Sequence, residues 1–243
     1  MLNIVITMGG IGSRFQKAGY TQPKYKIETK GRTLFEWSLI SLESFRKLVP
    51  TYIFIVKSSD QSSTFITESC HTLGLSNIHI IEIEELTDGQ ATTALFGESV
   101  WDPSLPLLIF NIDTHIEPEY LLPETIQGEG WIPCFQAPGE SWSFVKLDAE
   151  QNAVEVREKK RVSDFASVGI YWFSSAQSYS NVYKKYYSSS AREEKGEKYV
   201  APLYNQLIAE GKRVTIVDIP LERVHVLGTP EELTAFNESL YSR

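Results

Sequence analysis

The chain has 243 residues, 42% of them apolar and 22% charged, which is enough to bury the core of one large α/β domain or two small ones. Its net charge of −8 argues against nucleic acid or an anionic membrane as the main partner. No run approaches the ~18 consecutive apolar residues that span a membrane. Cys70 and Cys134 lie far apart and indicate neither a metal site nor a disulfide framework. These features predict a cytoplasmic protein.

The first half of the chain alternates short apolar runs with amphipathic patterns. Strands are predicted at residues 2–8, 52–56, 78–83 and 105–110. Helices are predicted at residues 64–73 and 90–95, and Thr33 and Glu36 have the spacing of a capping box in front of a further apolar helix face. This order predicts an α/β fold with a Rossmann-like, mostly parallel sheet and helices on both faces.

The second half has a different pattern. Four strand candidates follow with little helix between them, at residues 131–136, 143–147, 153–157 and 168–173. A helix at 198–210, a strand at 213–219 and a closing helix at 230–240 follow, and we expect residues 188–197 to form a mobile polar loop. We expect one domain, 1–243, in which residues 126–243 form a mixed-sheet lobe that covers the carboxyl edge of residues 1–125.

A glycine-rich turn follows the first strand. Met8 ends the strand, and Gly9, Gly10, Gly12 and Ser13 lie directly after it. Glycines at this position let backbone N–H groups approach phosphate oxygens closely. The turn lacks the Gly-Lys-Ser/Thr of a Walker loop and the Gly-x-Gly-x-x-Gly of a dinucleotide site. The pattern favours a phosphate-binding loop, with a plain glycine turn and two solvated cations as the alternative.

Two cations accompany this turn. Arg14 would present its planar fork to the β- and γ-phosphates of a nucleotide, and Lys24 would present a point charge to the α-phosphate. Gly-Gly-Ile-Gly-Ser-Arg-Phe followed by Pro-Lys resembles the signature of the sugar-phosphate nucleotidyltransferases. The resemblance continues through the Asp-Gly-Gln-Ala turn at Asp88, the strand end at Asn111, and the Gly-Thr-Pro element at Gly228, and it covers nearly the whole chain.

The resemblance implies a GT-A-like nucleotidyltransferase fold and a magnesium-dependent reaction. Within the family, the chain is most similar to the short capsule-cluster branch that includes a CTP:phosphoglutamine cytidylyltransferase. The implied activity transfers a nucleoside monophosphate from a nucleoside triphosphate to a small phosphorylated acceptor and releases pyrophosphate, for surface-polysaccharide precursors. A sugar phosphate, a phosphopolyol and a phosphorylated amide all fit as acceptor. No pattern predicts an oligomeric state.

The resemblance also implies roles for residues at strand ends. Asp88 and Gly89 correspond to the nucleoside-contacting turn, and Asn111 and Asp113 to the metal-binding strand end. Asp113 follows an apolar strand, where parallel sheets place their ligand sites, and a carboxylate there suits Mg²⁺. An Asp that only caps the following turn is the alternative.

A second metal carboxylate usually stands two residues before the Gly-Thr-Pro glycine in this family. Val226 occupies that position here. His225 is adjacent, but consecutive residues of an extended segment point to opposite sides. We therefore expect Asp113 alone among these residues to hold the metal, with His225 as an ordinary structural histidine.

Acceptor binding is implied for four residues in the second half. The resemblance assigns Lys159 to the acceptor phosphate, Glu158 to acceptor hydroxyl or amine groups, and Trp142 and Gly169 to the same subsite. A short charged run such as the one at Glu158 is otherwise typical of a solvated strand end, and Trp142 could equally be a core residue.

Glu84 gives a prediction about the base. In thymidylyl- and uridylyl-transferring relatives, a Gln five residues before the turn glycine resembles the base reader, and here that position is Glu84. An ionised carboxylate only accepts hydrogen bonds. It therefore suits the amino groups of cytosine or guanine better than uracil or thymine. The branch resemblance favours CTP over GTP, and a solvated pair of charges at a strand end is the alternative.

Two other classes remain open at this stage. A GT-A type glycosyltransferase shares the half-sheet architecture and could use Asp113 for its metal, but it would not need Arg14 and Lys24 on a triphosphate. A catalytically inactive, regulatory homologue is the second alternative, because Val226 replaces a metal carboxylate. Pyrophosphate release from a triphosphate and a phosphorylated acceptor separates all three.

Overall fold

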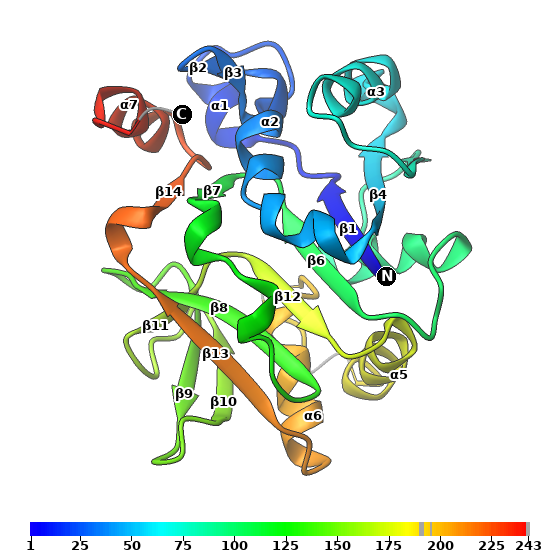
Figure 1. Cartoon of the computed structure of the whole chain (residues 1–243), viewed down its shortest axis with the longest axis vertical. Helices are drawn as coiled ribbons and strands as arrows, with labels where there is room; N and C mark the ends of the chain where they lie inside the picture. Colours follow the sequence, from blue (N-terminus) through cyan, green and yellow to red (C-terminus); the bar gives the residue numbers. More distant parts are fainter. Residues whose placement is uncertain (190–191, 195, 242–243) are drawn as a thin grey trace.

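The strands of both halves of the chain join in one sheet (Figure 1). The computed structural model describes residues 1–189, 192–194 and 196–241. The sheet has ten strands in the order β10-β9-β11-β8-β12-β6-β1-β4-β5, with β13 paired to the other edge of β8. The predicted α/β class with a large, mostly parallel central region flanked by helices is confirmed.

The parallel region of the sheet comes from the first half of the chain. Its strands, all close to their predicted positions, are β1 (Leu2–Met8), β4 (Pro50–Lys57), β5 (Ile78–Ile83) and β6 (Leu107–Asn111). β1 lies between β4 and β6, so that the glycine turn after β1 and the end of β6 meet at one edge of the sheet.

The second half extends this sheet sideways. β12 pairs antiparallel with β6, and the other antiparallel strands continue outward from it. The strands are β8 (Gly130–Gln136), β9 (Ser143–Leu147), β10 (Ala153–Glu158), β11 (Phe165–Ser167), β12 (Ile170–Phe173) and the parallel β13 (Val214–Ile219). The strands of this lobe therefore lie beside the parallel region in the same sheet.

Helices cover both faces of the sheet, because the side chains of its central strands alternate. Ile4 and Phe54 belong to the hydrophobic cluster under α2 and α3, whereas Val5 and Ile53 belong to the cluster under α4, α5 and α6. The helices are α1 (Ser13–Lys17), α2 (Leu34–Ile40), α3 (Ser63–Thr72), α4 (Gln90–Leu95), α5 (Ala176–Tyr186), α6 (Tyr204–Ala209) and α7 (Pro230–Glu238).

Short elements complete the fold. A small hairpin pairs β2 (Glu28–Thr29) with β3 (Arg32–Thr33), and a separate two-stranded sheet pairs β7 (Thr114–Ile116) with the distant β14 (Val224–Val226). Turns of 3₁₀ helix lie at Lys24–Lys26, Glu43–Leu48, Ser58–Asp60, Phe96–Ser99, Pro118–Tyr120, Pro123–Thr125, Ala201–Leu203 and Leu221–Arg223.

A third hydrophobic cluster fixes the C-terminal helix beside the end of β6. Leu233 and Phe236 of α7 pack with Trp37 of α2 and Phe15 of α1. The backbone N–H of Leu227 donates to the carbonyl of Asp113 at 2.8 Å. The segment that leads into α7 is therefore held against the loop after β6, although the two lie more than 100 residues apart in sequence.

Two sequence predictions need correction, and one helix was missed. The strand predicted at residues 168–173 is β12 and begins only at Ile170, because Gly169, with a φ of +86°, breaks the extended backbone between β11 and β12. The predicted helix 198–210 is only α6 after a 3₁₀ turn, because the backbone of Lys198 is bonded to Asp88 instead. Helix α5 was not predicted. Residues 190, 191 and 195 of the predicted mobile loop lie outside the described residues.

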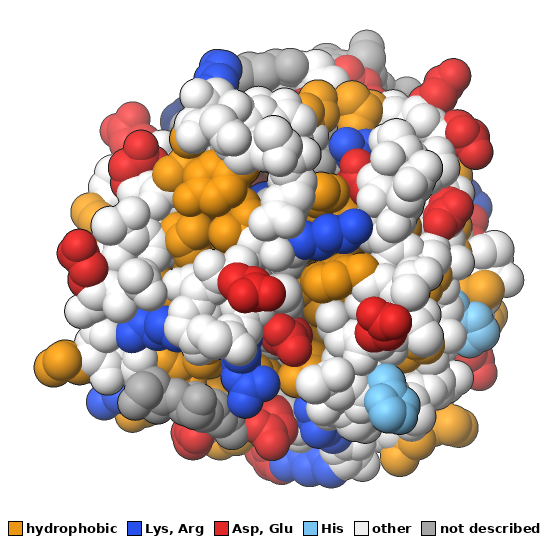
Figure 2. Space-filling model, turned by 90° about the horizontal axis from the view of Figure 1, so that it is seen from above, with side chains coloured by type: hydrophobic (Ala, Val, Ile, Leu, Met, Phe, Trp, Pro, Cys, Tyr) orange, Lys and Arg blue, Asp and Glu red, His pale blue; other side chains and the backbone are white. Residues whose placement is uncertain are grey.

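The surface carries mixed charges. On the face shown in Figure 2, basic and acidic side chains are interspersed and no continuous basic expanse is visible. Within the described residues, none of the helices has both the length and the apolar character that a membrane crossing needs.

Candidate active site

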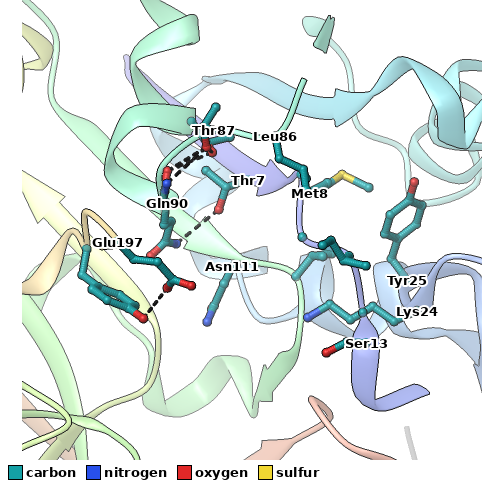
Figure 3. Close-up of a pocket in the computed structure, with 18 residues that line it drawn as sticks. Thr7, Met8, Ser13, Lys24, Tyr25, Leu86, Thr87, Gln90, Asn111 and Glu197 are labelled. Carbon is teal, nitrogen blue, oxygen red and sulfur yellow. Dashed lines mark hydrogen bonds between the residues drawn. The ribbon is translucent and has the colours of Figure 1, made fainter. Parts of the chain in front are cut away.

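A cavity of about 460 Å³ lies at the carboxyl edge of β1 and β6. Figure 3 shows Lys24 and Tyr25 on one side of it and Gln90 and Glu197 on the other. Its lining contains most of the residues predicted for nucleotide binding: Met8, Gly9, Gly10, Gly12, Ser13, Lys24, Gly89 and Asn111. A glycine turn, a lysine and an apolar wall thus surround a space of the size that small-molecule sites have.

The backbone of the glycine turn is open toward this cavity. Gly12 takes a left-handed φ of +67° as the N-cap of α1, and no side chain caps the first turn of that helix in the described residues. A Cβ at Gly10 would meet nothing within 4 Å. This loop can therefore approach phosphate oxygens with its backbone N–H groups, as the sequence predicted.

A second cavity of about 260 Å³ adjoins the first. Gln90, Asn111 and Tyr199 line both cavities. Arg14, Asp113, Trp142, Glu158 and Gly169, all singled out from the sequence, line the second cavity together with Ser143, Tyr171, Val226, Gly228 and Glu232. Arg14, predicted to face the leaving phosphates, thus lies on the second cavity and not on the first.

An ion pair marks the boundary between the two cavities. Lys24 lines the first cavity and Asp113 the second, and Lys24 Nζ donates to Asp113 Oδ2 at 2.6 Å. Both side chains keep partial exposure, 18% and 25%, so they are accessible from solvent. The cation and the carboxylate predicted to act on the α-phosphate and the metal are therefore in direct contact.

The turn at Gly89 binds the strand-like segment around Lys198. A Cβ at Gly89 would lie 2.4 Å from the Lys198 carbonyl oxygen, so only glycine permits this approach. Lys198 Nζ pairs with Asp88 Oδ2 at 2.5 Å, and this hydrogen bond raises the pKa of Lys198. The contact brings Glu197 and Tyr199 to the cavities. Gly89 therefore also positions a segment of the second half of the chain.

Lys159 and Glu158 differ in their relation to the cavities, although Lys159 Nζ lies 3.9 Å from Glu158 Oε1. Lys159, with a left-handed φ of +51°, donates from Nζ to the Tyr199 hydroxyl at 2.5 Å and is absent from the lining of both cavities. Glu158 lines the second cavity, its side chain only 9% exposed, and accepts a hydrogen bond from Ser143 Oγ. Burial raises the pKa of Glu158, more than this hydrogen bond and the charge of Lys159 lower it.

Gly169 makes room for the side chain of Asn111. A Cβ at Gly169 would lie 2.2 Å from Asn111 Oδ1. That oxygen is buried and has no hydrogen-bond partner among the described residues. Gly169 therefore shapes the junction of the cavities by admitting an amide, which the sequence resemblance did not specify.

Glu84 and His225 lie away from the cavities. Glu84 is exposed, accepts a hydrogen bond from Ser58 Oγ at 3.2 Å, and does not line either cavity. His225 packs among aromatic rings and its Nε2 is 3.5 Å from Glu117 Oε1, whereas Val226 faces the second cavity. Within the described residues, no three His, Cys, Asp or Glu side chains form a metal cluster.

Several lining residues were not predicted from the sequence. Gln90 donates from Nε2 to Thr7 Oγ1 at 3.2 Å, and its position within the conspicuous Asp-Gly-Gln-Ala turn could have identified it. Leu86, 54% exposed, supplies an apolar wall to the first cavity. Tyr199 comes from a segment that no local pattern distinguishes, whereas Glu232 lies two residues after the Gly-Thr-Pro element and has the Thr-x-x-Glu spacing of a helix start.

Comparisons with known proteins identify the family. No protein-family model and no curated protein matches the chain. Among solved structures, the nucleoside-diphosphate-sugar pyrophosphorylase from Vibrio cholerae RC9 is 35% identical, with a TM-score of 0.90, over 97% of this chain and 100% of that one.

Two more distant structures share the fold. The inositol-1-phosphate CTP transferase from T. maritima is 15% identical with a TM-score of 0.73, over 99% of this chain and 98% of that one. A Bacillus anthracis protein named as a glucose-1-phosphate thymidylyltransferase is 17% identical with a TM-score of 0.77, over 100% of this chain and 98% of that one. Given the identity to the Vibrio protein over nearly the full length of both chains, this chain belongs to the sugar-phosphate nucleotidyltransferase family of nucleoside-diphosphate-sugar pyrophosphorylases.

Proposed function

We propose that this chain transfers a nucleoside monophosphate from a nucleoside triphosphate, CTP by preference, to a small phosphorylated acceptor. One observation carries the proposal: two adjoining cavities share three lining residues, and the Lys24–Asp113 pair bridges their boundary at 2.6 Å. A triphosphate over the glycine turn and an acceptor in the second cavity would meet at this boundary. Residues 1–125 would supply most nucleotide contacts and residues 126–243 most acceptor contacts.

The reaction needs positioning and charge more than proton transfer. An acceptor phosphate oxygen forms a bond to the α-phosphorus. The bond from that phosphorus to the oxygen bridging to the β-phosphate breaks, and its electron pair leaves with pyrophosphate. Lys24 would exchange Asp113 for the α-phosphate, while the backbone N–H groups of Gly9, Gly10 and Gly12 hold the departing phosphates.

The oxygen atoms at the boundary fit a magnesium ion. Asp113 offers a carboxylate, and the buried Asn111 Oδ1 is an oxygen without a hydrogen-bond partner among the described residues. Magnesium takes oxygen ligands, commonly one or two carboxylates together with substrate phosphates and water. When bound, the ion supplies charge neutralisation to the phosphates. These two residues would hold it.

CTP is supported by the resemblance to a CTP-using branch and by the T. maritima neighbour, which its name describes as a CTP transferase. Glu84 remains our candidate for reading the base, although its carboxylate is exposed and bonded to Ser58. In Glu84→Gln, assayed with CTP and UTP in parallel, we expect CTP use to fall relative to UTP use. An unchanged ratio would mean that other groups, such as the backbone around Gly89, select the nucleotide.

The proposed activity is tested by pyrophosphate release. Each of the four ribonucleoside triphosphates is incubated with a panel of sugar phosphates, phosphopolyols and phosphorylated amides, with Mg²⁺ or with excess chelator. We expect release with CTP and one acceptor class, and none in chelator. Release that persists in chelator would contradict the metal requirement, and no release with any combination would support an inactive homologue. An NDP-sugar donor that glycosylates an acceptor would instead indicate a glycosyltransferase.

A further inference from the structure

Glu232 lies in the second cavity with an unusual lack of partners. It occupies the first turn of α7, where its backbone N–H donates to Thr229 Oγ1 at 3.2 Å. The residue lines the second cavity, and no hydrogen bond joins its carboxylate to the Thr229 N–H among the described residues. Atom Oε2 is fully buried, and no described residue donates a hydrogen bond to it. A buried carboxylate oxygen without a partner is costly, so its retention calls for a ligand.

The position of Gly228 shows what faces this oxygen. A Cβ added to Gly228 would lie 3.5 Å from Glu232 Oε2 and 3.5 Å from Asp113 Oδ2. The two carboxylate oxygens therefore face one small space and are separated by no more than twice that distance. Gly228 leaves that space open because it has no side chain.

The two carboxylates differ in their charge partners, and Arg14, which lines the same cavity, forms no ion pair with either of them among the described residues. Asp113 has the cation of Lys24 at 2.6 Å, whereas no ion pair involves Glu232 among the described residues. Val226, which lines the same cavity, contributes only apolar atoms. Two carboxylates that share a site repel each other unless a cation or a proton lies between them. Lys24 alone neutralises one of the two.

We infer that Glu232 is a second carboxylate for the divalent cation of this site, opposite Asp113. The inference rests on the proposed function, since it completes the same magnesium site. Asp113, Glu232 and the amide oxygen of Asn111 together form an all-oxygen donor set, the kind that Mg²⁺ and Mn²⁺ prefer. The C-terminal helix thereby contributes directly to the reaction site.

The test uses Mn²⁺ alone as the probe, titrated into the full chain without nucleotide or acceptor. Free Mn²⁺ is measured by electron paramagnetic resonance. Loss of even an indirect metal contact costs about 10–100-fold in affinity, so we expect Glu232→Gln and Asp113→Asn each to raise the Mn²⁺ Kd by at least about tenfold. The matched control is Glu231→Gln, which removes the same charge from the same helix turn at an exposed side chain and should leave the Kd unchanged.

The pattern across these variants separates the possible failures. A Glu232→Gln Kd equal to that of Glu231→Gln would overturn the inference, and a tenfold effect of Asp113→Asn alone would leave the magnesium site of the proposed function intact. If the wild-type chain binds no Mn²⁺, or if both site variants keep the wild-type Kd, both the inference and the metal part of the proposed function fail. A rise in acceptor KM with unchanged Mn²⁺ affinity would make Glu232 an acceptor contact and overturn the inference.

Thermal unfolding excludes a merely structural role. Both Glu→Gln changes remove a negative charge from the first turn of α7, which such charges stabilise equally. In metal-free buffer, we expect Glu232→Gln to unfold at or above the temperature of Glu231→Gln, because it removes an unpartnered buried charge. Added Mn²⁺ should raise the unfolding temperature of Glu231→Gln more than that of Glu232→Gln. A lower metal-free temperature for Glu232→Gln would assign it to the fold and contradict the inference.

Discussion

Two helices of this protein begin with the same Thr-x-x-Glu spacing and use the glutamate differently. At α2, Thr33 Oγ1 accepts from the Glu36 N–H at 3.2 Å, and Glu36 Oε2 accepts from the Thr33 N–H at 2.8 Å, so the capping box is complete. At α7, Thr229 accepts from the Glu232 N–H, but the Glu232 carboxylate faces the second cavity. A glutamate in the first turn of a helix can therefore cap that helix, as Glu36 does, or leave the cap and line a cavity, as Glu232 does.

The difference arises from the surroundings of each glutamate. Glu36 lies beside its own N-cap and a hydrophobic cluster, with only that cap to bind. Glu232 lies across Gly228 from Asp113, and both residues line the second cavity. At α7 the Glu232 N–H still donates to Thr229, as in a capping box, while the Glu232 carboxylate remains available for a ligand. Functional carboxylates can thus be found where a capping motif is only half formed.

The largest expected effect concerns Asp113, which lines the second cavity together with Glu232. Asp113→Ala should lower kcat by about 10³-fold or more, because the metal's charge stabilisation is worth several kcal/mol. The measurement is pyrophosphate release at saturating triphosphate and acceptor. Glu36→Ala, the counterpart at the capping-box helix, should retain wild-type kcat when folded. Comparable turnover in Asp113→Ala and Glu36→Ala would break the comparison.

The start of helix α1 extends the comparison between α2 and α7. Helix α1 begins after Gly12 without a side-chain cap, and Arg14 in its first turn lines the second cavity. We expect Arg14→Ala to reduce kcat/KM by about 10²-fold, the effect of losing one charge-assisted contact. Because of its position, the loss should appear mainly as a raised acceptor KM. Lys17→Ala, on the same helix but outside both cavities, is the control. A fall in kcat alone would support the contact with pyrophosphate that the sequence first indicated.

Unfolding measurements compare how much Glu36 and Glu232 stabilise the helices that they begin. Glu36→Ala should lower the free energy of unfolding by about 1 kcal/mol, because it leaves the Thr33 N–H without its acceptor. Glu232→Ala should cost less than half as much, because loss of the favourable charge at the helix N-terminus is offset by removal of a buried oxygen that has no hydrogen-bond partner among the described residues. Denaturant unfolding of both variants, with an unchanged m-value, measures the difference. Equal losses would show that Glu232 caps its helix as Glu36 does.

Glu158 is a further carboxylate of the second cavity, and it accepts a hydrogen bond from Ser143 Oγ. Its folded-state pKa is raised by burial, so the folded chain binds this proton more tightly than the unfolded chain. The contribution of Glu158 to stability is therefore highest below the unfolded value of 4.5 and declines as pH rises toward the folded value. The free energy of unfolding of Glu158→Gln, minus that of wild type, should increase over this window. A difference independent of pH would contradict the burial of the charged form.

Local patterns were sufficient for much of the fold. Short apolar runs placed the parallel strands β1, β4, β5 and β6. Strands β1, β4 and β6 are largely buried on both faces, whereas β5 at the sheet edge is only partly buried. The Thr33–Glu36 box and the glycine turn at Gly12 are likewise local, since their hydrogen bonds and backbone angles involve only adjacent residues.

Other features depended on contacts between distant segments. The strand break at Gly169 exists because the Asn111 side chain occupies the space where a Cβ would lie, and the two residues are far apart in sequence. The helix predicted from residue 198 was lost for a similar reason, since the Lys198 backbone pairs with the turn at Asp88. The periodicity of apolar residues along the sequence carries no information about either of these long-range contacts.

The sequence by itself determined the α/β class and the phosphate-loop candidate after β1, because these follow from local residue types and spacing, whereas the metal role expected of Asp113 came from the family resemblance. Only the tertiary structure decided that Lys24 and Asp113 form an ion pair between two cavities, and that Glu232 leaves its cap to face Asp113. The physical reason is that α7 is fixed by packing against α1 and α2. That packing directs an otherwise ordinary glutamate into the site.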